Sequence, residues 1–256
     1  MGSHWRGFFG PVVVTAAFAC GSQGSGSASP CTRCSDAGSA PDTESVAAEA
    51  AVGGGRPSFD TNLDGVPYPN PASGYGHSAR SGTTAGSVMQ NFKFLGYPNA
   101  DRSHGLTTIA LADYYDPCNK RLKLLHLSVA GVWCGPCNQE TDALVAAGKP
   151  LATLGVVVLQ ALDDGAVQNQ PATKGDLDYW VTLHRSNFTS VLDPGLHNLG
   201  GFFDAAAIPW NCDIDPRTME IIDASVGWSG NVMTDVTTAL QSLPVTPSSP
   251  LPVQCP

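Results

Sequence analysis

The stretch that decides the fold is Trp133-Cys134-Gly135-Pro136-Cys137, which follows an apolar run and precedes a helical pattern. Cys134 would start the helix, where unpaired N–H groups and the positive end of the helix dipole stabilise a thiolate. Pro136 suits the first helical turn, because its missing N–H is not needed there. Cys137, one turn further on, would be more buried and within reach of a disulfide with Cys134.

Short apolar segments alternate with helical patterns on both sides of this motif. We expect strands at 92–94, 109–111, 122–130, 154–161, 188–192, 210–214 and 219–222. Further helices are expected after a Thr173 cap and at 231–240. The runs at 122–130 and 154–161 suit central strands covered on two faces. Strand–helix–strand units followed by a hairpin predict an α/β domain with a sheet of mixed direction.

The motif and its surroundings resemble the thioredoxin superfamily, and within it the TlpA/ResA-like (redoxin) branch of exported thiol–disulfide proteins. Thr108–Tyr115 and Lys120–Leu125 are similar to the turn and the Lys-rich link that precede the central strand in that branch. Ala207–Trp210 is similar to the cis-proline loop of the family. The resemblance covers residues 86–243 and implies a thioredoxin-like fold, with a mixed central sheet, flanking helices and an N-terminal β extension.

The resemblance also implies the roles of individual residues. Cys134 would be the attacking thiol and Cys137 the resolving thiol. Pro209, if cis, would face the dithiol and leave the Ile208 backbone free to pair with an extended substrate. The expected substrate-binding residues are Trp133, Gly135, Pro136, Ile208 and Pro209. No cofactor and no metal site is expected.

Proton transfer is where this chain departs from thioredoxin. Ser128 stands where thioredoxin has a buried aspartate, and Val129 and Ala130 replace the usual aromatic pair. Glu140, three residues after the second cysteine as in the redoxin branch, is a candidate proton-transfer group, or else a solvated helix carboxylate. We interpret Asp163 and Asp164 as a loop rim.

The N-terminal residues 1–20 have the pattern of a secretory signal, with a short basic start and a short apolar centre. The small residue before Cys20 resembles a bacterial lipobox, although Ala17 stands where leucine is usual. Cys20 is therefore a candidate lipid anchor. Two other interpretations agree with the same residues. The leader could be cleaved before Cys20 without lipid attachment, or the first residues could be an added tag that precedes a buried strand.

Composition divides the rest of the chain. Residues 21–85 form a Gly- and Ser-rich tether with an extended segment, 86–243 the thioredoxin-like domain, and 244–256 a Pro-rich tail. The net charge is −9, from 13 basic and 22 acidic residues, and with no basic run this excludes a nucleic-acid surface. The expected partners are a disulfide-bearing protein and an electron donor. Membrane contact is expected only through a lipid anchor, which places the protein in the periplasm or cell envelope.

The remaining cysteines divide into two groups. Cys31 and Cys34 lie in the tether, where a simple disulfide or an incidental pair is favoured over catalysis. A four-cysteine zinc site with Cys134 and Cys137 is an alternative based on spacing alone. Among Cys118, Cys212 and Cys255, one disulfide would leave one free thiol. We prefer Cys118–Cys255, which would pin the tail, with Cys212 in the core.

These observations predict an exported thiol–disulfide oxidoreductase, and Gly-Pro between the cysteines favours a reductant. Two alternatives stay open. The first is a non-catalytic thioredoxin-fold surface lipoprotein that binds a partner or a metal. The second is a peroxide reductase, whose usual Pro-x-x-x-Thr-x-x-Cys arrangement is absent from the chain.

Overall fold

The computed structural model describes residues 58–70, 83–204, 207–247 and 254–255, all within one compact unit, Gly53–Pro256. The predicted leader at 1–20 and most of the predicted tether lie outside the described residues, and the domain limits stay predictions. Among the residues described, no helix is long and apolar enough to cross a bilayer.

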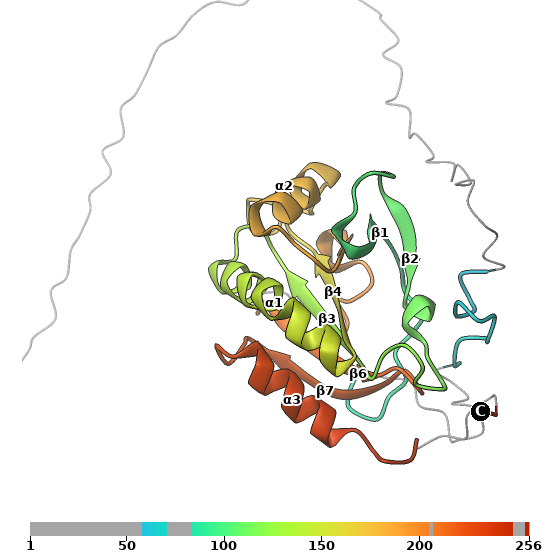
Figure 1. Cartoon of the computed structure of the whole chain (residues 1–256). Coiled ribbons are helices and arrows are strands. Elements are labelled where there is room, and N and C mark those ends of the chain that lie inside the picture. The colour runs from blue at the N-terminus through green and yellow to red at the C-terminus, as the bar shows by residue number, and fades with distance from the viewer. Residues whose placement is uncertain (1–57, 71–82, 205–206, 248–253, 256) are drawn as a thin grey trace, which may run out of the picture. The chain divides into compact units, whose positions relative to one another are not determined.

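The described residues form a seven-stranded sheet in the order β2-β1-β5-β4-β3-β6-β7. Its strands are β1 Lys93–Tyr97, β2 Thr107–Ala110, β3 Leu124–Ala130, β4 Val156–Leu162, β5 Thr189–Leu192, β6 Trp210–Asp215 and β7 Glu220–Val226. The central strands β3, β4 and β5 are parallel, and all other neighbours are antiparallel. The expected thioredoxin-like α/β fold is therefore present, and the β1–β2 hairpin is its N-terminal β extension (Figure 1).

Three helices pack on the same face of the sheet (Figure 1). They are α1 Gly135–Leu154, α2 Lys174–His184 and α3 Val232–Ser242. Along β3 the even-numbered residues point to this face: Leu124 packs with α1 and α3, and Ala130 packs with α2. The α2 helix begins as the sequence predicts, with a capping box between Thr173 and Asp176.

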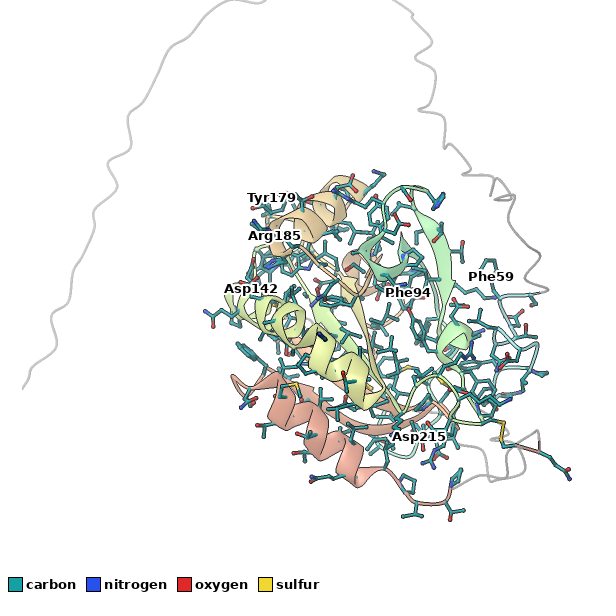
Figure 2. The ribbon with its side chains drawn as sticks, in the orientation of Figure 1. Phe59, Phe94, Asp142, Tyr179, Arg185 and Asp215 are labelled. Atoms are coloured by element: carbon teal, nitrogen blue, oxygen red, sulfur yellow. A yellow bond between two sulfur atoms is a disulfide. The ribbon has the colours of Figure 1, made fainter. Side chains whose placement is uncertain are left out.

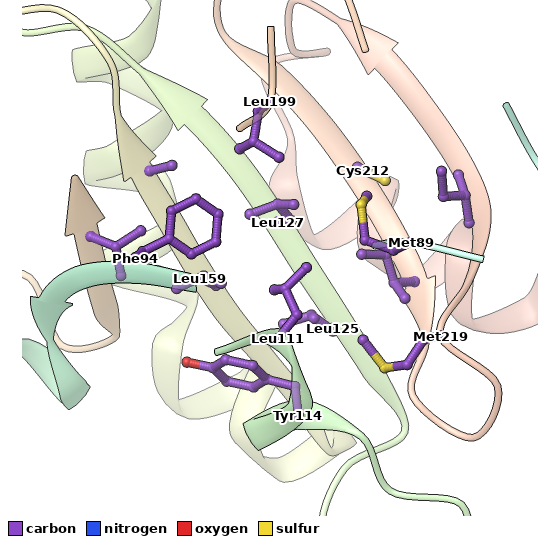
Figure 3. Close-up of a cluster of buried hydrophobic side chains, with 14 of the residues drawn as sticks. Met89, Phe94, Leu111, Tyr114, Leu125, Leu127, Leu159, Leu199, Cys212 and Met219 are labelled. Carbon is purple, nitrogen blue, oxygen red and sulfur yellow. The ribbon is translucent and has the colours of Figure 1, made fainter. Parts of the chain in front are cut away.

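The other face of the sheet has no helix of comparable length among the described elements; extended segments and short turns cover it. The odd-numbered residues of β3, Leu125, Leu127 and Val129, point into this apolar cluster. Figure 3 shows Leu125 and Leu127 surrounded by side chains that come from segments far apart in sequence. The labelled neighbours include Met89, Phe94, Leu111, Leu159 and Leu199. This core fixes the position of β3, the strand that leads into the cysteine motif.

Most element boundaries differ from the sequence prediction by one to four residues. The strand expected from 154 begins at Val156, because α1 runs to Leu154 and Gly155 ends it in the left-handed conformation, with φ +80°. The helix also continues through Pro150, a residue that usually ends helices. Leu151 is fully buried beneath it, so packing on the sheet holds the last turn in place.

Hydrogen bonds and one disulfide hold the described flanking segments on the domain. Asn62 donates from Nδ2 to the Tyr115 carbonyl at 3.1 Å, and Asn91 Nδ2 donates to the Phe59 carbonyl at 2.9 Å. At the other end, Cys118 and Cys255 form a disulfide, as the sequence analysis preferred. Arg217 adds a hydrogen bond from Nη2 to the Pro244 carbonyl at 2.7 Å. Residues 58–70, which are the described part of the predicted extended segment, and the start of the tail therefore lie on the domain.

Gly96 provides a test of the sheet packing. A Cβ at this position would lie 2.4 Å from the Ser190 carbonyl oxygen and 2.6 Å from Val191 Cγ1, where β1 meets β5. Gly96→Ala is expected to lower the free energy of unfolding by about 2 kcal/mol in urea denaturation. Gly201→Ala is the matched control, because a Cβ there meets nothing within 4 Å. Equal stability of the two variants would contradict the close approach of β1 and β5.

Candidate functional site

The cysteine motif lies where β3 ends and α1 begins, as the sequence predicts. Cys134 is the N-cap residue of α1 and is joined to Cys137 by a disulfide. The Cys137 N–H donates to Cys134 Sγ at 3.1 Å, so a helix N–H points at the sulfur that would carry the thiolate. Cys134 is 2% exposed and Cys137 is fully buried, so Cys134 is the better placed of the two to meet another molecule.

A cis-proline loop faces the disulfide. The Ile208–Pro209 peptide bond is cis, as the resemblance implied, and the Ile208 carbonyl oxygen lies 3.6 Å from Cys134 Sγ. Two features hold this loop in place. The strand β6 begins at Trp210 and pairs with β3, and the Gly227 N–H donates to the Pro209 carbonyl at 2.7 Å.

The expected substrate-binding residues surround Cys134. Gly135 and Pro136 are exposed on the first turn of α1, while Trp133 and Ile208 are half-buried beside them. A Cβ on Gly131 would lie 3.0 Å from Trp133 Nε1 and 3.1 Å from Ile208 Cδ1. A glycine at 131 therefore lets these two side chains approach each other next to the disulfide. Their contact with a substrate stays a prediction.

The interpretation of Asp163 and Asp164 as a loop rim is wrong. The two side chains are buried, and Trp133 donates from Nε1 to Asp164 Oδ2 at 3.0 Å. Burial, together with the Asp164 charge, raises the pKa of Asp163 to about 7. The pair follows β4 directly, at the end of the strand where α/β sites gather. The contact with Trp133 joins residues 31 apart in the sequence, so no local pattern predicts it.

Glu140 is buried on α1, three residues after Cys137, so the alternative of a solvated carboxylate is wrong. It is 2% exposed and accepts hydrogen bonds from Asn211 Nδ2 at 2.7 Å and from Ser128 Oγ at 3.3 Å. Burial raises the pKa of Glu140 to about 7, although the His126 charge and these two hydrogen bonds act in the opposite direction. The helix thus brings a carboxyl group to Ser128, the position where thioredoxin has its aspartate.

The buried polar residues near Glu140 include some that the sequence analysis did not select. Asn211 holds Glu140, and His126 lies on the same face of β3 as Ser128, with its Nδ1 2.8 Å from Asp213 Oδ1. His126 is buried, and it forms an ion pair with Asp213 when its ring is protonated. The alternation of polar and apolar residues along 124–130 was the signal available for this cluster.

The other cysteines that the structure describes, Cys118, Cys212 and Cys255, take no part in this site. Cys212 is a buried free thiol in the core, as expected, and burial raises the pKa of that thiol. Cys20, Cys31 and Cys34 lie outside the described residues, so the lipid anchor and the second cysteine pair stay predictions. In the described part of the chain, no cluster of three or more His, Cys, Asp or Glu side chains could hold a metal ion.

Several solved structures are similar to this chain. The thioredoxin domain of a thiol–disulfide oxidoreductase from Bacteroides vulgatus is 14% identical, covers 62% of this chain and 99% of its own, and has a TM-score of 0.47. A secreted thiol–disulfide isomerase from Corynebacterium glutamicum is 22% identical, covers 65% of this chain and 95% of its own, and has a TM-score of 0.44. Peroxidoxin BcpB from Mycobacterium tuberculosis is 12% identical, covers 63% and 96%, and has a TM-score of 0.46.

No family model matches the chain, and no curated protein matches it.

Proposed function

We propose that this protein is a thiol–disulfide oxidoreductase that exchanges the Cys134–Cys137 dithiol with a disulfide of a partner protein outside the cytoplasm, as a reductant. The observation that supports this most is the position of Cys134 Sγ, which accepts the Cys137 N–H at the start of α1 and lies 3.6 Å from the Ile208 carbonyl. The helix start stabilises a thiolate there, and the neighbouring loop offers main chain to an extended substrate.

The reaction has two steps. The Cys134 thiolate attacks one sulfur of the partner disulfide, and the other partner sulfur leaves with the electron pair and takes a proton. Cys137 then loses its proton and attacks Cys134 Sγ. This attack forms the Cys134–Cys137 disulfide seen in the structure and releases the second partner sulfur as a thiol. Glu140 is proposed to accept the Cys137 proton, because the two residues lie three apart on the same buried face of α1.

The proposed cycle needs a second protein. A reduced dithiol donor must return two electrons and two protons to the Cys134–Cys137 disulfide, and no cofactor takes part in these steps. Export follows from the predicted leader, and attachment to a membrane from lipidation of Cys20. Mass spectrometry of the mature protein tests both, through its N-terminus and the added mass of an acyl chain.

Trapping tests the proposal and identifies the partner. Cys137→Ser stops the reaction after the first step, so it should accumulate a mixed disulfide through Cys134 that non-reducing gels resolve and mass spectrometry identifies. The control is the double variant Cys134→Ser/Cys137→Ser, which should capture nothing. A lack of any Cys134-dependent adduct would contradict the exchange reaction and favour the non-catalytic binding protein.

A further inference from the structure

A cavity of about 540 Å³ lies between α3, the β6–β7 hairpin and the middle of the sheet. Its lining runs from the exposed residues Asp223 and Ser229 to the buried residues His126, Glu140 and Asn211. Figure 1 shows α3 beside β7, with α1 next to it, so the cavity is bounded by elements on the helical side of the sheet. Polar groups thus continue from the protein surface to the carboxyl group of Glu140.

Glu140 connects this cavity with the cysteine motif. Cys137 is fully buried, so a proton that leaves its thiol must first pass to a neighbouring group. Glu140 follows it by three residues on α1, a spacing that places two side chains on the same face of a helix. Glu140 also lines the cavity, where water can take the proton onward.

Among the residues that line the cavity, His126 is the one whose side chain can carry a positive charge. It comes from β3, and acidic residues from three other elements act on it: Glu140 of α1, Asp213 of β6 and Asp235 of α3. The neighbouring strand β4 pairs Val158 with it and adds no charge there. Burial by itself would lower the pKa of His126, but the Asp213 charge and hydrogen bond, with Glu140 and Asp235, raise it above the ordinary value. The positive charge of His126 in turn favours the ionised form of Glu140, whereas Asp235 opposes it.

We propose that this cavity is the route by which the Cys137 proton reaches solvent, and that His126 is a positioning residue that sets the pH range in which Glu140 accepts it. The inference rests on the proposed thiol–disulfide exchange and assigns a role to a residue outside the cysteine motif. The proton moves from Cys137 Sγ to a Glu140 carboxylate oxygen and then to water in the cavity. The Cys137 thiolate meanwhile attacks Cys134 Sγ and displaces the bound thiol.

The test is a single-turnover reaction of the reduced protein with the aromatic disulfide 5,5′-dithiobis(2-nitrobenzoate). Attack by Cys134 releases one coloured thiolate, and resolution by Cys137 releases the second. In His126→Gln the cationic group is lost, so the pH midpoint of the second release should move upward by about one unit, with a rate about tenfold lower at pH 6. Asp235→Asn removes the opposing negative charge and should move the midpoint downward, which provides a second variant if His126→Gln does not fold.

The matched control is His184→Gln. His184 lies on α2 and forms a similar pair with Asp142 of α1, with its Nδ1 2.7 Å from Asp142 Oδ1, and neither residue lines the cavity. Figure 2 labels Asp142 near Arg185, the residue that follows His184. Its second-release profile should equal that of the wild type. The inference is overturned if His126→Gln and Asp235→Asn both keep the wild-type midpoint, or if His184→Gln shifts as far as His126→Gln. Failure of the exchange reaction itself looks different, because the wild type would then release no second thiolate.

Discussion

Replacing Cys134 with serine should reduce the rate of insulin disulfide reduction by roughly a thousandfold or more, to the background given by the reducing agent alone. The reason is chemical, since a serine hydroxyl at the start of α1 does not ionise near neutral pH and forms no mixed disulfide. The measurement is the turbidity of precipitating insulin chains at pH 7 with a small dithiol as donor.

The control for this experiment is Cys212→Ala. Cys212 is fully buried, and its side chain packs in the apolar cluster on the face of the sheet opposite the helices. The proposed chemistry does not use it, so the rate of insulin reduction should be unchanged. Activity that survives in Cys134→Ser but is lost in Cys212→Ala would show that the wrong thiol has been assigned.

Glu140→Gln should keep the hydrogen bonds of Glu140 but remove its ability to accept a proton. Glutamine can keep both contacts, since its Oε1 can accept from Asn211 and its Nε2 can donate to Ser128. It cannot take a proton from Cys137, so the second thiolate release should slow by about a hundredfold and lose its pH dependence around pH 7. A rate and pH profile equal to those of the wild type would remove Glu140 from the proton route.

The same substitution should alter the dependence of stability on pH. The pKa of Glu140 in the folded protein, about 7, lies above its usual value of 4.5, so the folded state holds the proton more tightly than the unfolded chain. The tighter binding of this proton in the folded state adds to the free energy of unfolding. The addition is fully present below pH 4.5, and about 3 kcal/mol of it is lost as the pH rises through 7.

Urea denaturation measures this contribution. Between pH 4.5 and pH 8 the wild type should lose about 3 kcal/mol of unfolding free energy relative to Glu140→Gln. The comparison between the two proteins cancels the parallel loss expected from Asp163, whose pKa is also raised to about 7. Parallel stability curves for the two proteins across this pH range would show that Glu140 titrates at its ordinary pKa.

The elements that were predicted correctly are those whose own residues, or their immediate neighbours in sequence, indicate them. The cysteine motif predicted a helix start, and α1 begins at Gly135 with Cys134 as its cap. Long apolar runs predicted β3 and β4, because central strands are covered on both faces. The Thr173 cap and the turn at 215–218 likewise predicted α2 and the β6–β7 hairpin, since short polar side chains satisfy the backbone where an element begins or turns.

The features that the sequence did not predict depend on contacts between distant segments. The hydrogen bond from Trp133 to Asp164 and the burial of Glu140 against Asn211 arise only when β4 and β6 lie beside β3. An aspartate or glutamate without a partner nearby in sequence is expected to be exposed to solvent. Here the tertiary contacts bury these residues instead. The continuation of α1 through Pro150 is similar, because buried contacts offset a local penalty.

The alternation of side chains along β3 has a consequence for how this protein can change. Leu125, Leu127 and Val129 belong to the apolar side, whereas His126 and Ser128 belong to the side of the dithiol and the cavity. Substitutions at the first set would act on folding alone, whereas substitutions at the second set would act on the buried hydrogen bonds beside the dithiol as well. Variants at His126 and Ser128 are therefore the ones expected to change the proposed thiol–disulfide exchange, and those at Leu125, Leu127 and Val129 are expected to change only stability.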